Sequence, residues 1–539
     1  MARRRAEHVA RRPTFSAGAC ALLALAYLGA LLALYARALQ GPFVSDDLHY
    51  VATNPYVHGL SWTNAKAILS PWGPATVAVV NYSPVQLLLH ASVWQLAGAE
   101  LFWHHAISLV FHAAASALLV PLLLRSGVPL AGAVLGSLLF LLHPANVEAV
   151  AWISQLKSTV GLALGFGAVL AHPRRPWLAL ALFALALLTK ANAAAVLPLA
   201  FWLAWSRDGA LRPRWLAAWL LVFACFALVE FTAHQRSGAA EAVLHQTPLV
   251  LIRTMAALAA RYLVMAATSL GLSTFHEPEP AYSLFDPWWL ASLPLLALLG
   301  WRTCHVARAR RPEAGWWLFA LISFGPVSQI FPFLYPLADR YLYYMLPGLI
   351  GGALCAFGDL ALHVPAPRRA LAGRAAFALG LALCALFAVR TVERAALWRS
   401  PVLLLADAAR HYPEGVSANL GRARSAAQRG DADATATALR AALARGFNRF
   451  EQLTGDPSFD AVRGSQAFQA VLREMAAVWI EAGRGWDSPT QGELRRLASA
   501  HALRGERDET VALLRRALAQ GGPHDAAIRD DLAALGASP

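Results

Sequence analysis

Residues 15–38 read FSAGACALLALAYLGALLALYARA, and two adjacent acids, Asp46 and Asp47, follow shortly after this run. A run of this length is long enough to cross a bilayer as a helix. Its apolar core exceeds the roughly 7–15 residues of a secretory signal, so we expect a retained span. Charge close to hydrocarbon is unfavourable unless it has a function. The stretch therefore predicts a first membrane span followed by a functional carboxylate pair.

The composition extends this prediction to most of the chain. Of the 539 residues, 58% are hydrophobic and 14% are charged, whereas soluble domains contain about 25% charged residues. We expect an all-α polytopic membrane protein with about eleven transmembrane helices. The segments that predict these helices are 15–38, 103–124, 128–142, 158–171, 177–190, 192–206, 215–233, 286–303, 315–333, 341–360 and 375–390.

Arginines mark one side of these spans, before the first span and in alternate connections. The positive-inside rule then predicts a cytoplasmic N-terminus and an inner (plasma) membrane protein whose C-terminal part is periplasmic. The segments expected outside are 39–102, 143–157, 234–285, 334–340 and everything after 391. The apolar stretch 249–273 would reverse the alternation, so we expect an interfacial or re-entrant helical pair there.

The charge is unevenly distributed along the chain. Residues 401–539 contain 17 Arg and 17 Asp or Glu, so the whole net charge of +14 belongs to residues 1–400. This distribution indicates membrane topology rather than a nucleic-acid partner. The five cysteines form no CxxC motif and mostly lie in apolar runs, which is typical of buried structural thiols.

The tail from 401 to 539 has a different pattern and is expected to form a separate domain. Gly430, Leu439, Leu443 and Gly446 recur 75 residues later as Gly505, Leu514, Leu518 and Gly521. Such spacing is typical of stacked helix–turn–helix units of about 34 residues, as in tetratricopeptide repeats, and would suit binding of a protein. A generic helical bundle is the alternative.

Three cations are candidates for binding a phosphate: Lys157, Lys190 and Arg340. The chain has only three lysines, Lys66, Lys157 and Lys190, and the topology places all of them outside, as it does Arg340. Lysine and arginine at an interface donate charge-assisted hydrogen bonds to phosphate. The alternative is that each side chain merely extends from a helix end toward water. Several cations and a carboxylate pair at the same face favour the first interpretation.

The sequence does not predict a zinc site. Histidines are frequent on the outer side, but none of them forms a clear ligand pair; they are His90, His104, His105, His112 and His143. Asp46 and Asp47 offer oxygens that suit a divalent cation such as Mg²⁺ or Mn²⁺. Two carboxylates alone supply too few ligands for a divalent cation unless a phosphate adds further oxygens.

A series of motifs gives the chain a resemblance that covers nearly its whole length. The motifs are Phe43-Val44-Ser45-Asp46-Asp47-Leu48-His49-Tyr50, Asn81-Tyr82-Ser83-Pro84, His104-His105, His143-Pro144 with Val147-Glu148, Leu188-Thr189-Lys190 and Ala338-Asp339-Arg340-Tyr341-Leu342-Tyr343. In this order they resemble the transmembrane and tetratricopeptide-repeat O-mannosyltransferases, which have the C-type glycosyltransferase fold.

The resemblance implies transfer of a sugar from a polyprenyl-phosphate donor to an acceptor hydroxyl, on a protein or glycan, outside the cytoplasm and with inversion. Asp46 or Asp47 would be the general base, sometimes with a divalent cation nearby. Lys157, Lys190 and Arg340 would neutralise the departing lipid phosphate. The matched motifs also name His105, His143, Glu148 and Tyr343 as supporting residues.

Some positions depart from the family pattern. Bacterial members often have Trp-His-Pro where Tyr82-Ser83-Pro84 stands, and Arg-Lys where Leu156-Lys157 stands. The lost arginine weakens the expected phosphate site. Two other functions are therefore open: a non-enzymatic membrane scaffold that displays the repeats, and a transporter of lipid-linked sugars, which would need no general base.

Overall fold

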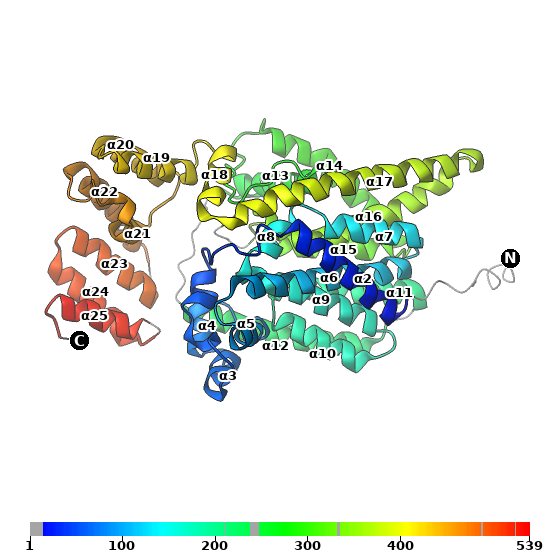
Figure 1. Cartoon of the computed structure of the whole chain (residues 1–539), viewed down its shortest axis with the longest axis horizontal. Coiled ribbons are helices and arrows are strands. Elements are labelled where there is room, and N and C mark those ends of the chain that lie inside the picture. The colour runs from blue at the N-terminus through cyan, green and yellow to red at the C-terminus, as the bar shows by residue number, and fades with distance from the viewer. Residues whose placement is uncertain are drawn as a thin grey trace.

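The computed structural model describes residues 15–209, 211–237, 247–330, 335–486, 489–522 and 524–538. Every regular element within these ranges is helical, which confirms the all-α fold. Figure 1 shows the apolar helices in one bundle and the last helices of the chain as a group at one end of it. The arginines expected at the cytoplasmic N-terminus, within residues 3–12, lie outside the described residues.

The bundle is formed by the part of the chain up to residue 399. Its helices are α2 (Ala17–Leu34), η1 (Leu48–Ala52), η2 (Pro55–Val57), α3 (Trp62–Leu69), α4 (Pro74–Val79), α5 (Pro84–Ala97), α6 (Leu101–Arg125), α7 (Leu130–Leu141), α8 (Asn146–Ala151), η3 (Ile153–Gln155), α9 (Leu156–Ala171), α10 (Pro176–Leu187), η4 (Ala191–Ala195), α11 (Val196–Asp208), α12 (Pro213–Ser237), α13 (Pro248–Thr268), α14 (Pro287–Arg308), α15 (Glu313–Phe324), η5 (Gly325–Val327), η6 (Asp339–Tyr341), α16 (Leu342–His363), α17 (Ala366–Ala395) and η7 (Ala396–Arg399).

Each of the predicted spans contains a helix. Within the described ranges, eight helices are long and apolar enough to cross a membrane, which agrees with a multi-pass membrane protein. The predicted spans 128–142, 177–190, 192–206 and 315–333 contain the shorter helices α7, α10, α11 and α15. A helix of 12 residues, such as α7, is about 18 Å long, against about 30 Å of hydrocarbon. The count of eleven spans therefore stays a prediction.

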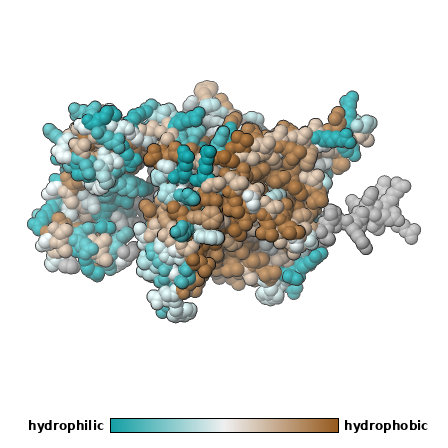
Figure 2. Space-filling model, in the orientation of Figure 1, coloured by the Kyte–Doolittle hydropathy of each residue, from teal (hydrophilic) through white to brown (hydrophobic). Residues whose placement is uncertain are grey.

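The helices α6 and α9 form the centre of the bundle. In their most apolar windows, 61% and 78% of the residues are buried, against 11% in α2 and in α14. Small residues permit this close packing: a side-chain carbon at Gly161 of α9 would lie 2.5 Å from the Tyr344 hydroxyl of α16. Figure 2 shows the apolar surface concentrated over the bundle and the hydrophilic surface mainly over the C-terminal helices.

The two ends of the bundle carry different segments. We call the end formed by residues 39–102, α8 and the start of α9 the outer end. The inner end is formed by the last turns of α6 and α9 and by the start of α15. The residues that were expected on opposite sides of the membrane are thus separated by the length of α6 and α9.

The helix α13 corrects the expectation of a helical pair at 249–273. The segment forms one continuous helix of 21 residues, because its interior contains no proline or glycine to interrupt it. Ala281 N donates to Thr254 Oγ1 at 3.0 Å, and the Ala266 carbonyl lies 3.0 Å from His143 Nε2. Length and composition would let α13 cross a membrane, so its interfacial placement stays a prediction.

The C-terminal helices pack as hairpins at the outer end. They are α18 (Pro401–His411), α19 (Val416–Gln428), α20 (Ala432–Ala444), α21 (Phe450–Gly455), η8 (Pro457–Phe459), α22 (Gln466–Gly483), α23 (Gln491–Leu503), α24 (Arg507–Gln520) and α25 (Asp525–Ala534). The hairpin α23–α24 reproduces α19–α20 at the predicted offset. Val416 N donates to Glu277 Oε2 at 2.6 Å, which attaches the hairpins to the segment before α14. The tetratricopeptide assignment and the domain boundary at 400 stay predictions.

Candidate functional site

Asp47 is a buried anchor for the first outer segment. Its side chain accepts hydrogen bonds from two backbone amides, Val44 N at 3.1 Å and Ser154 N at 2.7 Å. The residue is 1% exposed. A carboxylate in this position joins the segment after α2 to the turn before α9 and is not available to a substrate.

Burial sets the acidity of this anchor. It raises the pKa of Asp47 to about 7, because removal from water disfavours the ionised form more than the two amide donors favour it. The nearby carboxylate of Asp46 acts in the same direction. Asp47 is therefore partly neutral near pH 7.

Asp46 differs from its neighbour because its side chain is only partly buried. Ser45 precedes it with a φ of 51°, in a left-handed conformation that is strained for a non-glycine residue. The short π-helix η1 begins two residues after Asp46, and such turns are frequent at functional sites. The two acids therefore differ in burial. Asp46 is the carboxylate that a reactant can reach.

A tyrosine that the sequence analysis did not single out joins three parts of the site. The Tyr50 hydroxyl donates to the Val79 carbonyl at 3.0 Å and accepts from Asn81 Nδ2 at 3.0 Å and from Lys157 Nζ at 2.9 Å. The Lys157 ammonium also lies 4.5 Å from the centre of the Tyr50 ring. Tyr50 stands in the quoted first motif, and that position was its only sequence signal.

The two candidate lysines have neutral partners. Lys190 Nζ donates to Ser158 Oγ at 2.7 Å and to Gln155 Oε1 at 3.4 Å. Lys157 Nζ donates to the Tyr50 hydroxyl. Neither ammonium forms an ion pair with an acid among the described residues. The two interact electrostatically with each other, and Lys190 also interacts with Arg340 and with Glu148. An anion placed between them would therefore meet two lysines that form no direct ion pair among the described residues.

Arg340 is held in place by an acid and by aromatic rings. Its backbone N donates to Glu148 Oε2 at 2.7 Å, and its guanidinium forms an ion pair with the same carboxylate. The guanidinium carbon lies 5.2 Å from the Trp152 ring centre and 4.8 Å from the Tyr341 ring centre. Glu148, expected as a supporting residue, thus positions Arg340 from α8.

Electrostatic interactions link the predicted acid to the predicted cations. Asp46 interacts with Arg340, and Arg340 interacts with Lys190. Burial lowers the pKa of His49, while Asp46 raises it and Lys157 lowers it. We call Asp46, Lys157, Lys190 and Arg340 the outer cluster.

The remaining predicted residues lie against the backbone or one another. The His105 ring nitrogens lie 2.8 Å from the Ala151 carbonyl and 3.0 Å from the Gly41 carbonyl, so His105 joins α8 to the first outer segment. His143 Nδ1 accepts from Ala145 N at 3.1 Å, and burial lowers its pKa to about 4. The Tyr343 hydroxyl lies 2.9 Å from His112 Nδ1. These contacts support the scaffold of the site.

The two carboxylates predicted to bind a divalent cation are not equally available to one. The Asp47 carboxylate already accepts two backbone amides, which leaves Asp46 alone. Among the described residues, no group of three His, Cys, Asp or Glu side chains could hold a metal ion. A divalent cation held by Asp46 and a substrate phosphate stays a prediction.

Two curated proteins are similar to part of the chain. The human protein O-mannosyl-transferase TMTC1 is 33% identical over 147 residues, which is 25% of this chain and 16% of that protein. The mouse protein of the same name is 31% identical over 167 residues, 29% of this chain and 17% of that protein. This chain is related to the TMTC-type O-mannosyltransferases. The matched segment spans about a sixth of either relative. No family model and no solved structure matches the chain.

Proposed function

We propose that the chain is a membrane glycosyltransferase that moves a sugar from a polyprenyl-phosphate donor to a hydroxyl group of an acceptor protein, with inversion. The observation that carries this proposal is the outer cluster. In it a partly exposed carboxylate, Asp46, lies near two lysines with neutral partners and near Arg340, which Glu148 holds in place. The similarity to two O-mannosyl-transferases supports the same class of reaction.

The proposed step uses each member of the outer cluster in one role. Asp46 takes the proton of the acceptor hydroxyl as its oxygen attacks the anomeric carbon. The bond between that carbon and the phosphate oxygen breaks, and the polyprenyl phosphate leaves with the bonding electrons. Lys157 and Lys190 stabilise the negative charge that develops on the phosphate. Attack opposite the leaving group inverts the anomeric centre.

Arg340 and Asp47 have positioning roles in this proposal. Glu148 neutralises part of the Arg340 charge, so Arg340 orients the phosphate more than it adds net positive charge. Asp47 holds the Asp46 backbone against the turn before α9 through Ser154. The site would face the periplasm from the plasma membrane, and the C-terminal hairpins beside it would bind the acceptor protein.

The test compares Asp46→Asn with Asp47→Asn and wild-type protein in membranes from cells that lack the native protein. Radiolabelled polyprenyl-phosphate mannose serves as the donor, and label in protein is measured. Loss of a general base lowers the rate by about 10²-fold or more, so Asp46→Asn is expected to be nearly inactive at an unchanged amount of folded protein.

Two results would contradict the proposal. Wild-type rates in Asp46→Asn would remove the base. Movement of labelled lipid across vesicles without any acceptor, unchanged by Asp46→Asn, would instead indicate a transporter.

A further inference from the structure

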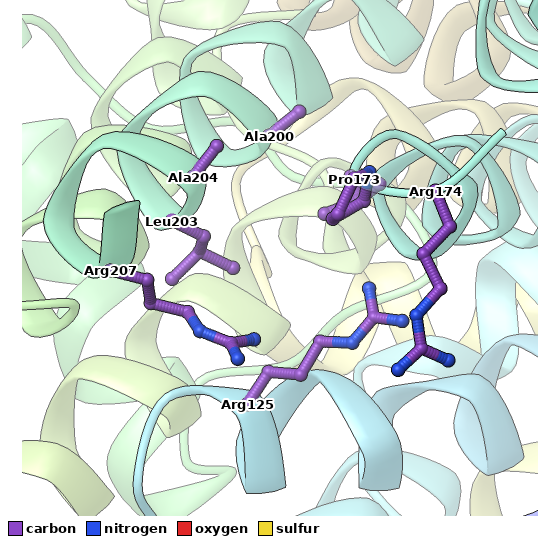
Figure 3. A pocket seen from close by; sticks show the side chains of 8 residues that line it. Arg125, Pro173, Arg174, Ala200, Leu203, Ala204 and Arg207 are labelled. Carbon is purple, nitrogen blue, oxygen red and sulfur yellow. The ribbon is translucent and has the colours of Figure 1, made fainter. Parts of the chain in front are cut away.

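A second group of cations lines a cavity at the inner end of the bundle. The cavity measures about 110 Å³ and is lined by Arg125, Arg174 and Arg207 together with Val169, Leu203 and other apolar residues. The three arginines come from three places in the chain: the end of α6, the turn between α9 and α10, and the end of α11. Figure 3 shows their guanidinium groups reaching into the same space.

These arginines have no acidic partner among the residues that the structure describes. Arg125 Nη1 donates to the Leu170 carbonyl at 2.8 Å, which fixes its guanidinium at the cavity wall. Among the described residues, Arg174 and Arg207 have no hydrogen-bond or ion-pair partner for their side chains. The three positive guanidinium groups line one cavity, and no described acid lies between them. Such an arrangement is electrostatically unfavourable unless an anion binds there.

Neighbouring arginines at the same end are different. Arg302 pairs with Glu313 at 2.7 Å and with Asp359 at 3.0 Å, and Arg311 pairs with Asp359. The positive-inside rule accounts for all of these arginines equally. It does not account for three guanidinium groups around one cavity with no acidic partner in the described part of the chain.

We propose that this cavity binds the phosphate of an anionic lipid headgroup in the inner leaflet. Guanidinium groups match phosphate oxygens with paired N–H donors, and basic pockets between membrane helices on the cytoplasmic side bind such headgroups. The apolar wall formed by Val169, Ala200 and Leu203 suits the start of an acyl chain. The site lies at the opposite end of α6 and α9 from the outer cluster and is independent of the proposed transfer reaction.

The test measures thermal unfolding of the purified full-length protein in neutral detergent, using the fluorescence of its 18 tryptophans. The ligands are dioleoyl-phosphatidylglycerol, dioleoyl-phosphatidylcholine and inorganic phosphate. We expect phosphatidylglycerol to raise the Tm of the wild type by about 2 °C or more, and phosphatidylcholine to have little effect. The double variant Arg174→Gln/Arg207→Gln should lose most of this rise.

The matched control is Arg368→Gln/Arg374→Gln, which removes two exposed arginines from the start of α17 that do not line the cavity. Phosphatidylglycerol should raise the Tm of this control variant as much as that of the wild type. Equal rises in both double variants, or no rise in the wild type, would overturn the proposal. A rise caused by inorganic phosphate alone, and lost in Arg174→Gln/Arg207→Gln, would assign the cavity to a soluble phosphate compound and overturn the lipid assignment.

Discussion

Two sets of cations in the bundle have different partners: Arg302 contacts acids, whereas Lys157 and Lys190 contact neutral groups. At the inner end, Arg302 forms a bidentate pair with Glu313, whose side chain is 2% exposed, and also contacts Asp359. At the outer end, Lys157 and Lys190 contact a phenol, an amide and a hydroxyl. The first arrangement uses the cation's charge within the protein, whereas the second leaves it available to a ligand.

This comparison separates stability from function. Removing a paired cation leaves a buried carboxylate without compensation, which destabilises the fold. Removing a cation with neutral partners should change stability little and ligand binding greatly. The following predictions test that distinction.

The largest effect is expected for Arg302→Gln. Breaking a buried ion pair from one side costs about 3–5 kcal/mol, so the free energy of unfolding in denaturant titrations should fall by roughly this amount. The double variant Arg302→Gln/Glu313→Gln should recover a large part of the loss. A single variant as stable as the wild type would show that the pair is not structural. Sugar transfer per folded molecule should be unchanged.

Lys157→Met should lower the rate of transfer strongly and change the stability little. Loss of charge stabilisation at the leaving phosphate is expected to lower the initial rate of transfer by about 10²-fold, while the free energy of unfolding changes by less than about 1 kcal/mol. The control is Lys66→Met, which changes an exposed lysine of α3 in the same outer segment. Equal rates in the two variants would remove Lys157 from the site.

A smaller effect is expected for Tyr50→Phe. This change keeps the ring under the Lys157 ammonium but removes the hydroxyl that Lys157 and Asn81 contact, so transfer should slow by about tenfold, a loss near 1.4 kcal/mol. Tyr56→Phe is the control, since its hydroxyl makes no hydrogen bond to the described residues. Transfer as fast in Tyr50→Phe as in Tyr56→Phe would show that the hydroxyl does not position Lys157.

The last prediction concerns stability alone and tests the pKa of Asp47. Its pKa is about 7 in the folded chain, against an ordinary value of 3.8, so between these values the folded state binds a proton that the unfolded state has lost. This contribution to stability is full below pH 3.8 and is lost as the pH rises through about 7. Unfolding titrations of wild type and Asp47→Asn at pH 4.5, 6 and 7.5 should therefore show the wild type's relative stability falling with pH. A constant difference would contradict the raised pKa.

The sequence predicted the helices well because apolar length is a local property. Each predicted span contains a helix, and the 75-residue offset in the tail corresponds to the hairpins α19–α20 and α23–α24. The one correction, at α13, concerns a segment whose apolar length and two arginines gave conflicting signals. Its continuity follows from an uninterrupted interior, but its contacts with Ala281 and His143 are long-range.

The site was less predictable because its geometry depends on distant contacts. Asp46 and Asp47 are equivalent in the sequence. The structure distinguishes them because Asp47 accepts from Val44 N and from Ser154 N, which is 107 positions away. The pairing of Glu148 with Arg340 joins residues 192 positions apart. The role of Tyr50 likewise arises from α4 and α9 meeting at its hydroxyl.

The most direct test of the central claim is the side of the membrane on which the outer cluster lies. A single cysteine in place of Lys66, in a variant without the five native cysteines, would be treated with an impermeant maleimide in right-side-out and inside-out vesicles. The account predicts labelling in the right-side-out vesicles only. Labelling confined to the inside-out vesicles would place Asp46 in the cytoplasm and contradict the proposed periplasmic transfer.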